Sequence, residues 1–186
     1  MENKTRCAWC EKDDLYRNYH DNEWGKPVYD DETIFEFLIL ETFQAGLSWY
    51  TVLAKRENFR KAFDNFDLMK IANYSEDKMD ALAEDAGIIR NKLKIKATVT
   101  NAQAFIKVQE EFGSFSTYIW GFVDGKPIDN KPNTLSEVKA TTPISDALSK
   151  DLKKRGFKFV GSTVMYAHMQ ATGMVNDHVV DCHTRK

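Results

Sequence analysis

Four side chains near the two ends of the chain are suited to holding a metal ion. Cys7 and His20 lie thirteen positions apart near the start, and His178 and Cys182 lie four positions apart near the finish. A spacing of four places two side chains on the same face of a helix. Thiolate and imidazole are donors that Zn²⁺ prefers in closed tetrahedral sites. The sequence therefore predicts a structural zinc site that ties the two ends of the chain together.

Two further residues compete for this site. Cys10 completes a Cys-x2-Cys pair with Cys7, which is a common half of a zinc site, and His183 directly follows Cys182. The end-to-end spacing matches no short zinc-finger pattern, and scattered thiols and surface imidazoles are the alternative explanation. His168 lies in an apolar stretch, where we expect a core histidine satisfied by hydrogen bonds. From the residues alone, the choice of ligands stays open.

A single carboxylate, Glu41, interrupts a strongly apolar helical pattern. A buried carboxylate needs a basic side chain, backbone donors or a positively charged ligand as its partner. Aromatic rings are dense around it, and rings beside a carboxylate form a pocket for a planar cation. The alternatives are that Glu41 faces solvent with Glu36 and that the rings fill the core. The aromatic residues are Trp9, Tyr16, Tyr19, Trp24, Trp49 and Tyr50.

Basic residues follow a glycine-containing turn at Gly87. Arg90, Lys92, Lys94 and Lys96 open the helix after this turn, and the backbone amides of such a helix start can hold a phosphate. A second basic cluster lies between positions 150 and 158. The alternative for both is a solvated helix face. No lysine is expected in an apolar setting that would lower its pKa, so Schiff-base chemistry is not predicted.

The apolar spacing is helical along most of the chain, so we predict an all-α protein in one compact unit or two closely packed lobes. Asp30 or Asp31 and Ser48 are expected N-caps, and Leu93 is expected to face the interior. The segment 124–143 holds three of the four prolines and is predicted to be an extended connection. Helices are expected at 32–45, from Ser48 through Leu53, and at 67–72, 75–84, 90–112, 145–155 and 161–172.

Composition excludes several classes of protein. The chain has 186 residues, with 26 basic and 28 acidic side chains, so a broad cationic surface is not expected and nucleic-acid contact must use local basic patches. No apolar run reaches the roughly 20 residues of a membrane span. Three cysteines without an apolar leader favour reduced thiols in the cytoplasm. We expect a single domain over residues 1–186.

Several strings in this order resemble the DNA-3-methyladenine glycosylase I family. The resemblance covers nearly the whole chain and implies a helix–hairpin–helix fold with a zinc site that joins the termini. It assigns the ligands to Cys7, His20, His178 and Cys182, and so decides against Cys10 and His183. The strings are Tyr19-His-Asp-Asn-Glu-Trp-Gly25, Gln44-Ala-Gly-Leu-Ser-Trp49, Asp85-Ala-Gly-Ile-Ile-Arg90, Lys153-Lys-Arg-Gly-Phe-Lys-Phe-Val-Gly161 and Val175-Asn-Asp-His-Val-Val180.

The same resemblance implies roles for the pocket and for the DNA contacts. Glu41 falls on the carboxylate that recognises the base, and Trp49 falls on the ring that stacks on it. Gly46 and Leu47 fall on the segment that enters the duplex. Arg90 occupies the place near the second glycine of the superfamily's hairpin, so the phosphate grip is expected to rely more on side chains. Further pocket residues are Trp9, Tyr16 and Tyr19, and the hairpin residues are Gly87, Arg90 and Lys92.

The resemblance implies a monomeric, monofunctional glycosylase that flips 3-methyladenine out of alkylated double-stranded DNA and releases it as the product. The family lacks the catalytic aspartate of its superfamily, and no residue here is expected to act as a general base. Two other classes fit the same residues: a zinc-stapled DNA-binding module without catalysis, and a hydrolase of a small cationic modified nucleoside. Base release from alkylated DNA, compared with the free nucleoside, distinguishes the three.

Overall fold

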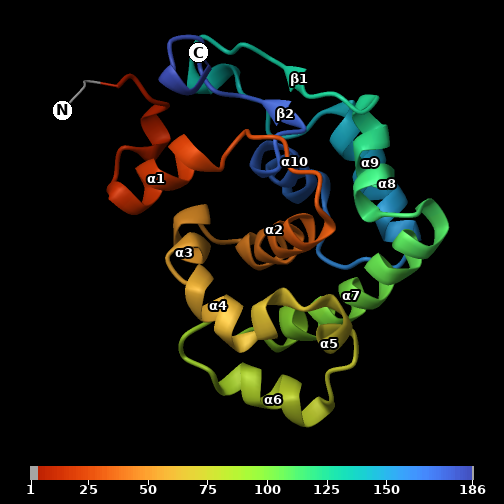
Figure 1. Ribbon diagram of the computed structural model, residues 1–186. Helices are drawn as coiled ribbons and strands as arrows, with labels where there is room; N and C mark the ends of the chain where they lie inside the picture. The colour runs from red at the N-terminus through yellow and green to blue at the C-terminus, as the bar shows by residue number, and fades with distance from the viewer. Residues whose placement is uncertain (1–3, 186) are drawn as a thin grey trace.

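The structure is a computed structural model that describes residues 4–185. Ten α-helices make up most of this part of the chain, joined by short 3₁₀ turns and one pair of two-residue strands (Figure 1). The helices are α1 (Asp14–Asn22), α2 (Asp31–Gln44), α3 (Trp49–Leu53), α4 (Arg56–Ala62), α5 (Leu68–Ala72), α6 (Glu76–Glu84), α7 (Lys92–Phe112), α8 (Phe115–Trp120), α9 (Pro143–Lys154) and α10 (Ser162–Ala171). The 3₁₀ turns are η1 (Ala8–Cys10), η2 (Asp64–Phe66), η3 (Gly121–Val123), η4 (Leu135–Glu137) and η5 (His183–Arg185).

Side chains fix where several of these helices begin. The Asp30 side chain accepts a hydrogen bond from the Thr33 amide at the start of α2, and Ser48 accepts one from the Thr51 amide at the start of α3. Ser75 caps α6 in the same way, although the acid of a full capping box is absent. Asp30 and Ser48 are therefore confirmed as N-caps.

The predicted helices are all present, but three observed helices are absent from the prediction. These are α1, α4 and α8, which have nine, seven and six residues. Helices this short are marginal in water on their own, so they form because the rest of the protein packs against them. The residue pattern within each of these segments therefore gives little indication that the segment is helical.

The prediction for the interior face of α7 is wrong in its first turn. Leu93 is 72% exposed, whereas its neighbour Lys94 is only 6% exposed. The later turns follow the prediction, with Ala97, Phe105 and Val108 buried. The first turn differs because the Lys94 ammonium donates to two backbone carbonyl groups in the interior.

A short parallel strand pair departs from the all-α expectation. Ile128 of β1 (Ile128–Asp129) pairs with Val175 of β2 (Val175–Asn176). Strands of two residues cannot display the alternation by which a sequence reveals a strand. The pair anchors the otherwise extended segment 124–143, as predicted from its prolines, to the chain just after α10.

Helix α2 forms the centre of the core. It packs against α3, α7, α8 and α10, and nine of its 14 residues are buried (Figure 1). A helix that is apolar on nearly all sides is expected in such a position. The consequence for function is that any polar side chain on its inner half, Glu41 included, is enclosed by other helices.

The two ends of the described chain lie side by side. Figure 1 shows α1 beside the C-terminal segment, and the His183 amide donates to the Thr5 carbonyl oxygen at 2.9 Å. This proximity brings together the N-terminal and C-terminal residues predicted to bind metal.

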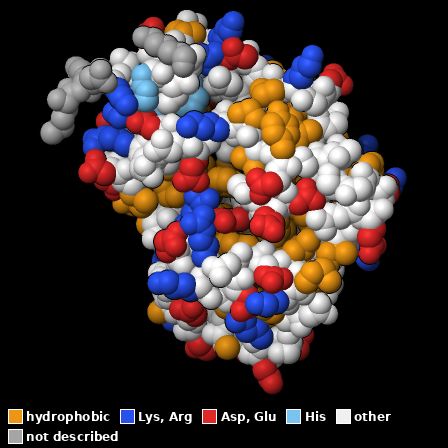
Figure 2. All heavy atoms as spheres, viewed as in Figure 1, with side chains coloured by type: hydrophobic (Ala, Val, Ile, Leu, Met, Phe, Trp, Pro, Cys, Tyr) orange, Lys and Arg blue, Asp and Glu red, His pale blue; other side chains and the backbone are white. Residues whose placement is uncertain are grey.

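The outer surface has no strongly cationic face in the view of Figure 2, where acidic and basic side chains are interspersed. This agrees with the formal net charge of −2. Within residues 4–185, no helix combines the length and the apolar character needed to cross a bilayer.

Candidate active site and metal centre

A cavity of about 270 Å³ lies between α1, α2, α3 and α10. Its walls are aromatic: Trp9 comes from η1, Tyr16 and Tyr19 from α1, Trp24 from the turn after α1, and Trp49 from the start of α3. The Trp9 ring centroid lies 4.8 Å from that of Tyr16 and 5.0 Å from that of Trp24, and Tyr19 lies 5.4 Å from Trp49. Five of the six rings considered for a pocket in the sequence therefore form one continuous lining.

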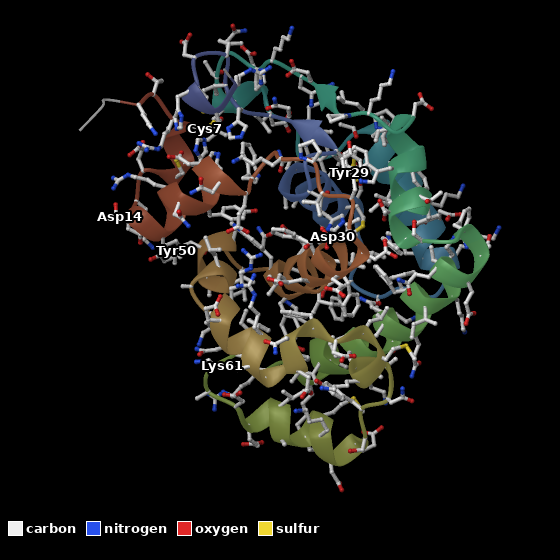
Figure 3. The ribbon with its side chains drawn as sticks, viewed as in Figure 1. Cys7, Asp14, Tyr29, Asp30, Tyr50 and Lys61 are labelled. Atoms are coloured by element: carbon white, nitrogen blue, oxygen red, sulfur yellow. The ribbon has the colours of Figure 1, made fainter. Side chains whose placement is uncertain are left out.

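Tyr50 joins α3 to the N-terminal part of this wall. Figure 3 shows it between α3 and α1, where its hydroxyl donates to the Asp13 carboxylate and its ring lies 5.3 Å from that of Tyr16. Asp13 is also the N-cap of α1, since it accepts from the Tyr16 amide. Tyr50 does not line the cavity, so its role is to hold two of its walls together.

Glu41 projects from the interior of α2 into this cavity. It is 3% exposed, and its Oε2 atom has no hydrogen-bond partner among the described residues. Burial raises the pKa of the Glu41 carboxyl to about 8, because desolvation penalises the charged form. The indole N–H of Trp49 is likewise buried without an acceptor. A cavity with an unpartnered acceptor and an unpartnered donor is suited to a polar, flat ligand.

A second cavity of about 180 Å³ adjoins the first, since Glu41, Gln44 and Ala167 line both. Its outer border is the loop that follows α2. There Gly46 has a φ of +81°, which favours glycine, and Leu47 is 43% exposed. The loop thus presents an apolar side chain to solvent directly beside the enclosed carboxylate.

A larger hollow lies elsewhere and carries no comparable chemistry. It has a volume of about 620 Å³ and is lined by residues of α2, α5 and η2, with several carboxylates among them. None of the side chains predicted for the site lines it. The smaller aromatic cavity is the better candidate, because rings and unpartnered polar atoms converge there.

The turn between α6 and α7 holds the predicted phosphate-binding residues. The Gly87 carbonyl oxygen of this turn accepts from Lys55 at 3.3 Å and from Asn58 at 3.2 Å. Arg90 and Lys92 are exposed. These residues do not line the aromatic cavity, so the structure separates the predicted phosphate contacts from the predicted base pocket.

The expectation that no lysine lies in an apolar setting is wrong. The Lys94 ammonium is buried and donates to the Phe43 carbonyl at 2.8 Å and the Ala45 carbonyl at 2.6 Å. Burial lowers the pKa of Lys94. The free carbonyls at a helix C-terminus carry partial negative charge, so an ammonium stabilises them. Lys94 thereby ties the start of α7 to the end of α2, next to Gly46.

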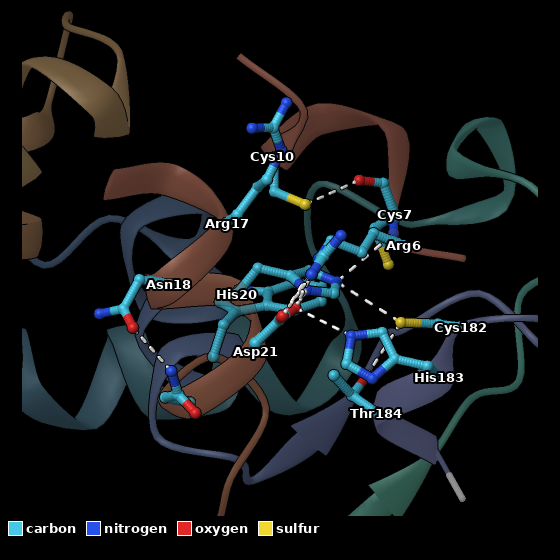
Figure 4. A network of polar contacts seen from close by, with 12 residues as sticks. Arg6, Cys7, Cys10, Arg17, Asn18, His20, Asp21, Cys182, His183 and Thr184 are labelled. Atoms are coloured by element: carbon cyan, nitrogen blue, oxygen red, sulfur yellow. Dashed lines mark hydrogen bonds and ion pairs between the residues drawn. The ribbon is translucent and has the colours of Figure 1, made fainter. Parts of the chain in front are cut away.

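The four predicted metal ligands converge at the other side of the aromatic wall. Cys7, His20, His178 and Cys182 are all buried, and their ligand atoms lie within 4.8 Å of one another. Figure 4 shows three of them, Cys7, His20 and Cys182. Burial lowers the pKa of His178 to about 4 and lowers that of His20, so both imidazoles are neutral and have a lone pair to donate. This cluster can hold one metal ion.

Neighbouring groups orient each imidazole. His20 Nδ1 lies 2.8 Å from the Asp21 carboxylate, so its Nε2 faces the cluster. His178 Nε2 lies 2.9 Å from the Trp24 carbonyl oxygen, so its Nδ1 faces the cluster. Burial alone would raise the pKa of Asp21, but hydrogen bonds from Arg6, His20 and His183 outweigh it and hold this pKa well below the usual range. Such supporting partners are typical of metal-binding histidines.

The two competing residues lie outside the cluster. The Cys10 thiol donates to the Cys7 carbonyl at 3.1 Å, and His183 Nε2 lies 3.0 Å from Asp21 (Figure 4). Cys10 therefore stabilises the turn that carries Cys7, and His183 supports the carboxylate that orients His20.

The metal cluster and the aromatic cavity share a wall. The Trp24 ring centroid lies 4.6 Å from that of His178, and the Trp9 ring lies 5.3 Å from that of His20. Gly25, which follows Trp24, has a φ of +75°, and a Cβ atom there would lie 3.0 Å from the His178 ring. The metal ligands thus contact two of the rings that face the cavity.

Comparison with known proteins places this arrangement in a family. The sequence profile described as methyladenine glycosylase matches residues 9–186. The chain belongs to the methyladenine glycosylase family. DNA-3-methyladenine glycosylase 1 of Escherichia coli (strain K12) is 51% identical over 177 residues, which cover 95% of each chain. A DNA-3-methyladenine glycosylase of Haemophilus influenzae is 48% identical over 96% of each chain.

Solved structures agree with the family assignment. A crystal structure of 3-methyladenine DNA glycosylase I superposes with a TM-score of 0.93 at 49% identity, covering 96% of this chain and 98% of the other. A tyrosine-to-phenylalanine variant of 3-methyladenine DNA glycosylase I in complex with 3-methyladenine superposes with a TM-score of 0.94 at 37% identity, covering 97% of each chain. The predicted family is confirmed.

Some cavity residues of this methyladenine glycosylase family member were not predicted. Leu135 and Val138 line the cavity from the segment 124–143, and Gln170 lines it from the last turn of α10. Sequence spacing gives no sign of them, because they approach Glu41 only through the strand pair and the packing of α10 on α2. Trp24 was singled out only as one of several aromatic residues.

The contribution of Glu41 to the stability of this family member is expected to fall as pH rises from about 4.5 to about 8. Across this range Glu41 stays protonated in the folded state but ionises in the unfolded state, where its pKa is 4.5. Between the two pKa values, ionisation of Glu41 in the unfolded state lowers the free energy of unfolding by roughly 1.4 kcal/mol per pH unit. Glu41→Gln should therefore be more stable than the parent protein at pH 8 and about equally stable at pH 4.5. Urea unfolding of both proteins across this range measures the effect; parallel pH profiles would contradict it.

Replacing Lys94 by methionine is expected to lower the free energy of unfolding by about 1–3 kcal/mol, because two carbonyl groups at the end of α2 lose their donor. Lys92→Met is the matched control. Its ammonium is 71% exposed and makes one contact of 3.4 Å with Asp80, so its loss should change stability by less than about 0.5 kcal/mol. Urea denaturation of both variants would refute the assigned role of Lys94 if they were equally stable.

Proposed function

We propose that this chain is a monofunctional base-excision repair glycosylase that hydrolyses the N-glycosidic bond of 3-methyladenine in alkylated double-stranded DNA. The observation that carries the proposal is the buried, unpartnered carboxylate of Glu41 in a cavity with aromatic walls. The names of its relatives support the reaction and the lesion. A modified nucleoside hydrolase is less favoured, because the relatives are described as DNA glycosylases.

The cavity has the properties required to select a cationic purine. A 3-methylated adenine in DNA carries positive charge, so it stacks on electron-rich rings and attracts a carboxylate, whereas normal purines are neutral. The positive base would also offset the desolvation of Glu41 and lower its pKa, so that the carboxylate ionises when the lesion is bound. We therefore assign Glu41 to base recognition, Trp49 to stacking, and Trp9, Tyr16 and Tyr19 to the remaining wall.

The chemistry requires little from the protein. The bond between the sugar C1′ and the base nitrogen breaks with its electron pair moving to the base, which leaves as neutral 3-methyladenine. A water oxygen then bonds to C1′ and releases a proton to solvent. Glu41 stabilises the positive base in place and is not required to protonate it. The Lys94 amine is held by two backbone carbonyls, which supports a reaction without a Schiff base.

We propose that two loops make different contacts with the DNA. Gly46 and Leu47 would enter the duplex where the base has left, because Leu47 is an exposed apolar side chain beside Glu41. The turn between α6 and α7 would act as the helix–hairpin–helix motif, with Gly87, Arg90 and Lys92 holding the phosphate backbone. Lys94 connects the two loops. The active unit would be a monomer with one domain over residues 1–186.

For the metal centre, we propose a structural Zn²⁺ ion. With Zn–S distances of about 2.3 Å and Zn–N distances of about 2.0–2.1 Å, tetrahedral geometry separates sulfur from nitrogen by about 3.5 Å and two nitrogens by about 3.3 Å. The cluster has sulfur–nitrogen distances of 3.5 Å, 3.5 Å and 3.6 Å and a nitrogen–nitrogen distance of 3.2 Å. The ion would fix the two ends of the chain and the histidines behind the aromatic wall.

Glu41→Gln is expected to keep the fold and to reduce release of 3-methyladenine from methylated DNA by about 100-fold or more, since a preorganised charge is lost. Chromatography of the freed bases, with 7-methylguanine as a second product, measures this directly. Glu32→Gln, an exposed acid on the same helix, should leave release unchanged. Near-normal release by Glu41→Gln would refute the recognition role. If the parent protein released no 3-methyladenine, the alternative of a DNA-binding module without catalysis would be favoured.

The purified protein should contain one zinc ion per chain. Cys182→Ala should lose this ion and lower the melting temperature, whereas Cys10→Ala should keep the ion because its thiol lies outside the cluster. Elemental analysis and thermal unfolding of both variants provide the measurement. A parent protein that is isolated without zinc, or a Cys182→Ala variant with unchanged melting, would contradict the assignment.

A further inference from the structure

Three polar, non-aromatic side chains accompany Glu41 in the lining of the aromatic cavity: Gln44, Lys139 and Gln170. Lys139 is exposed, so it lies at the rim. Gln170 differs from the other two, because its side-chain amide is fixed by a hydrogen bond within the described part of the chain. Its Nε2 atom donates to Asp177 Oδ2 at 2.8 Å.

Asp177 is a strong anchor for this amide. It is 3% exposed, and it also accepts from the Tyr166 hydroxyl at 2.7 Å and from Asn130 Nδ2 at 2.7 Å. A carboxylate that receives three donors accepts hydrogen bonds only, so it determines which end of the Gln170 amide faces it. The amide nitrogen is turned toward Asp177, and Oε1 is left as the end available to a ligand.

The backbone of Gln170 is held equally firmly. Its carbonyl oxygen accepts from the Gly25 amide at 3.0 Å, which joins the last turn of α10 to the turn that carries Trp24. The side chain is thus fixed at both ends, and no donor within residues 4–185 is bonded to Oε1. A preorganised acceptor without a partner, on the border of a cavity, is available to bind a ligand donor.

We propose that Gln170 is a specificity-determining residue, whose Oε1 accepts a hydrogen bond from the exocyclic amino group of an adenine-type base. This inference rests on the proposed function. The rings of the cavity cover the faces of a bound purine, so the polar side chains contact its edge. Adenine presents an amino donor at the position where guanine presents the O6 acceptor. Oε1 therefore favours adenine-type lesions and opposes guanine-type lesions.

Glu41 and Gln170 then read different properties of the same base. The carboxylate selects for positive charge, which N3-methylated adenine and N3-methylated guanine share. The amide oxygen separates these two lesions by the polarity of one edge group. A wrong edge contact of this kind is worth about 10- to 100-fold in discrimination.

Two variants test the proposal on DNA that contains both 3-methyladenine and 3-methylguanine. Gln170→Leu removes the acceptor and should lower the preference for 3-methyladenine over 3-methylguanine by about 10-fold or more. Asp177→Asn replaces one of the two carboxylate acceptors by an amide donor, so the Gln170 amide is no longer held in a single orientation and can present its NH₂ group to the cavity. This variant should lower 3-methyladenine release further and raise the relative release of 3-methylguanine.

Gln103→Leu is the matched control, because Gln103 is also a helix glutamine with a fixed amide, which donates to the Ala72 carbonyl at 2.9 Å away from the cavity. It should leave the ratio of released bases unchanged. Binding of the two free bases, followed by tryptophan fluorescence, gives a second readout that does not depend on turnover. Zinc content and melting temperature verify that each variant is folded.

The outcomes separate this inference from the function on which it rests. A ratio of released bases, and of free-base affinities, that is the same in Gln170→Leu as in the parent protein would overturn the role of Gln170 while leaving the glycosylase assignment intact. A parent protein that releases no 3-methyladenine would overturn the assignment itself. Should Asp177→Asn fail to fold, the free-base affinities of Gln170→Leu decide the question.

Discussion

The candidate site depends on an unfavourable feature, a carboxylate that is buried without a hydrogen-bond partner among the described residues. Helix α2 is enclosed by α3, α7, α8 and α10, so Glu41 is only 3% exposed, and burial raises its pKa to about 8. A protein selected only for stability would place an apolar side chain here, since burying an unpartnered acid opposes folding. In the proposed function, the cost is confined to the ligand-free protein, because a positively charged base would provide the missing partner. Selectivity for a cationic ligand and reduced stability of the empty site would then have the same physical origin.

The aromatic walls require support from outside the hydrophobic core. Trp9, Tyr16 and Trp24 are only partly buried, and they belong to η1, α1 and the following turn, which contain few core residues of their own. The Cys–His cluster lies directly behind them, and His20 and His178 contact Trp9 and Trp24. A metal ion in this cluster would act on the binding pocket as well as on the chain ends. The strand pair β1–β2 extends the same support to Asp177 and Gln170.

The sequence predicted the parts of this structure that depend on residue type and local spacing. Cys7, His20, His178 and Cys182 converge as expected, and Glu41 lies among the predicted rings. The expectation of hydrogen bonds at His168 is wrong, since both of its ring nitrogens are buried without a partner among the described residues. The other failures concern residues whose environment is made by distant segments. Lys94 is buried because the end of α2 presents carbonyl groups to it, and Leu93 is exposed as a consequence. Gln170 is oriented by Asp177, seven positions later, through a turn that no periodicity reveals.

The modest charge of the protein is consistent with a mechanism that depends on selection more than on catalysis. With 26 basic and 28 acidic side chains, the surface cannot hold DNA by a general cationic field, so local contacts must suffice. A labile, cationic lesion compensates for weak binding of the DNA by the protein, because its glycosidic bond breaks readily once the base is stabilised outside the helix. In the proposed mechanism, this lability means that neither a general base nor a free lysine is required. The protein would then need only a pocket that binds neutral purines weakly, which is the role proposed for the enclosed carboxylate of Glu41 and its neighbours.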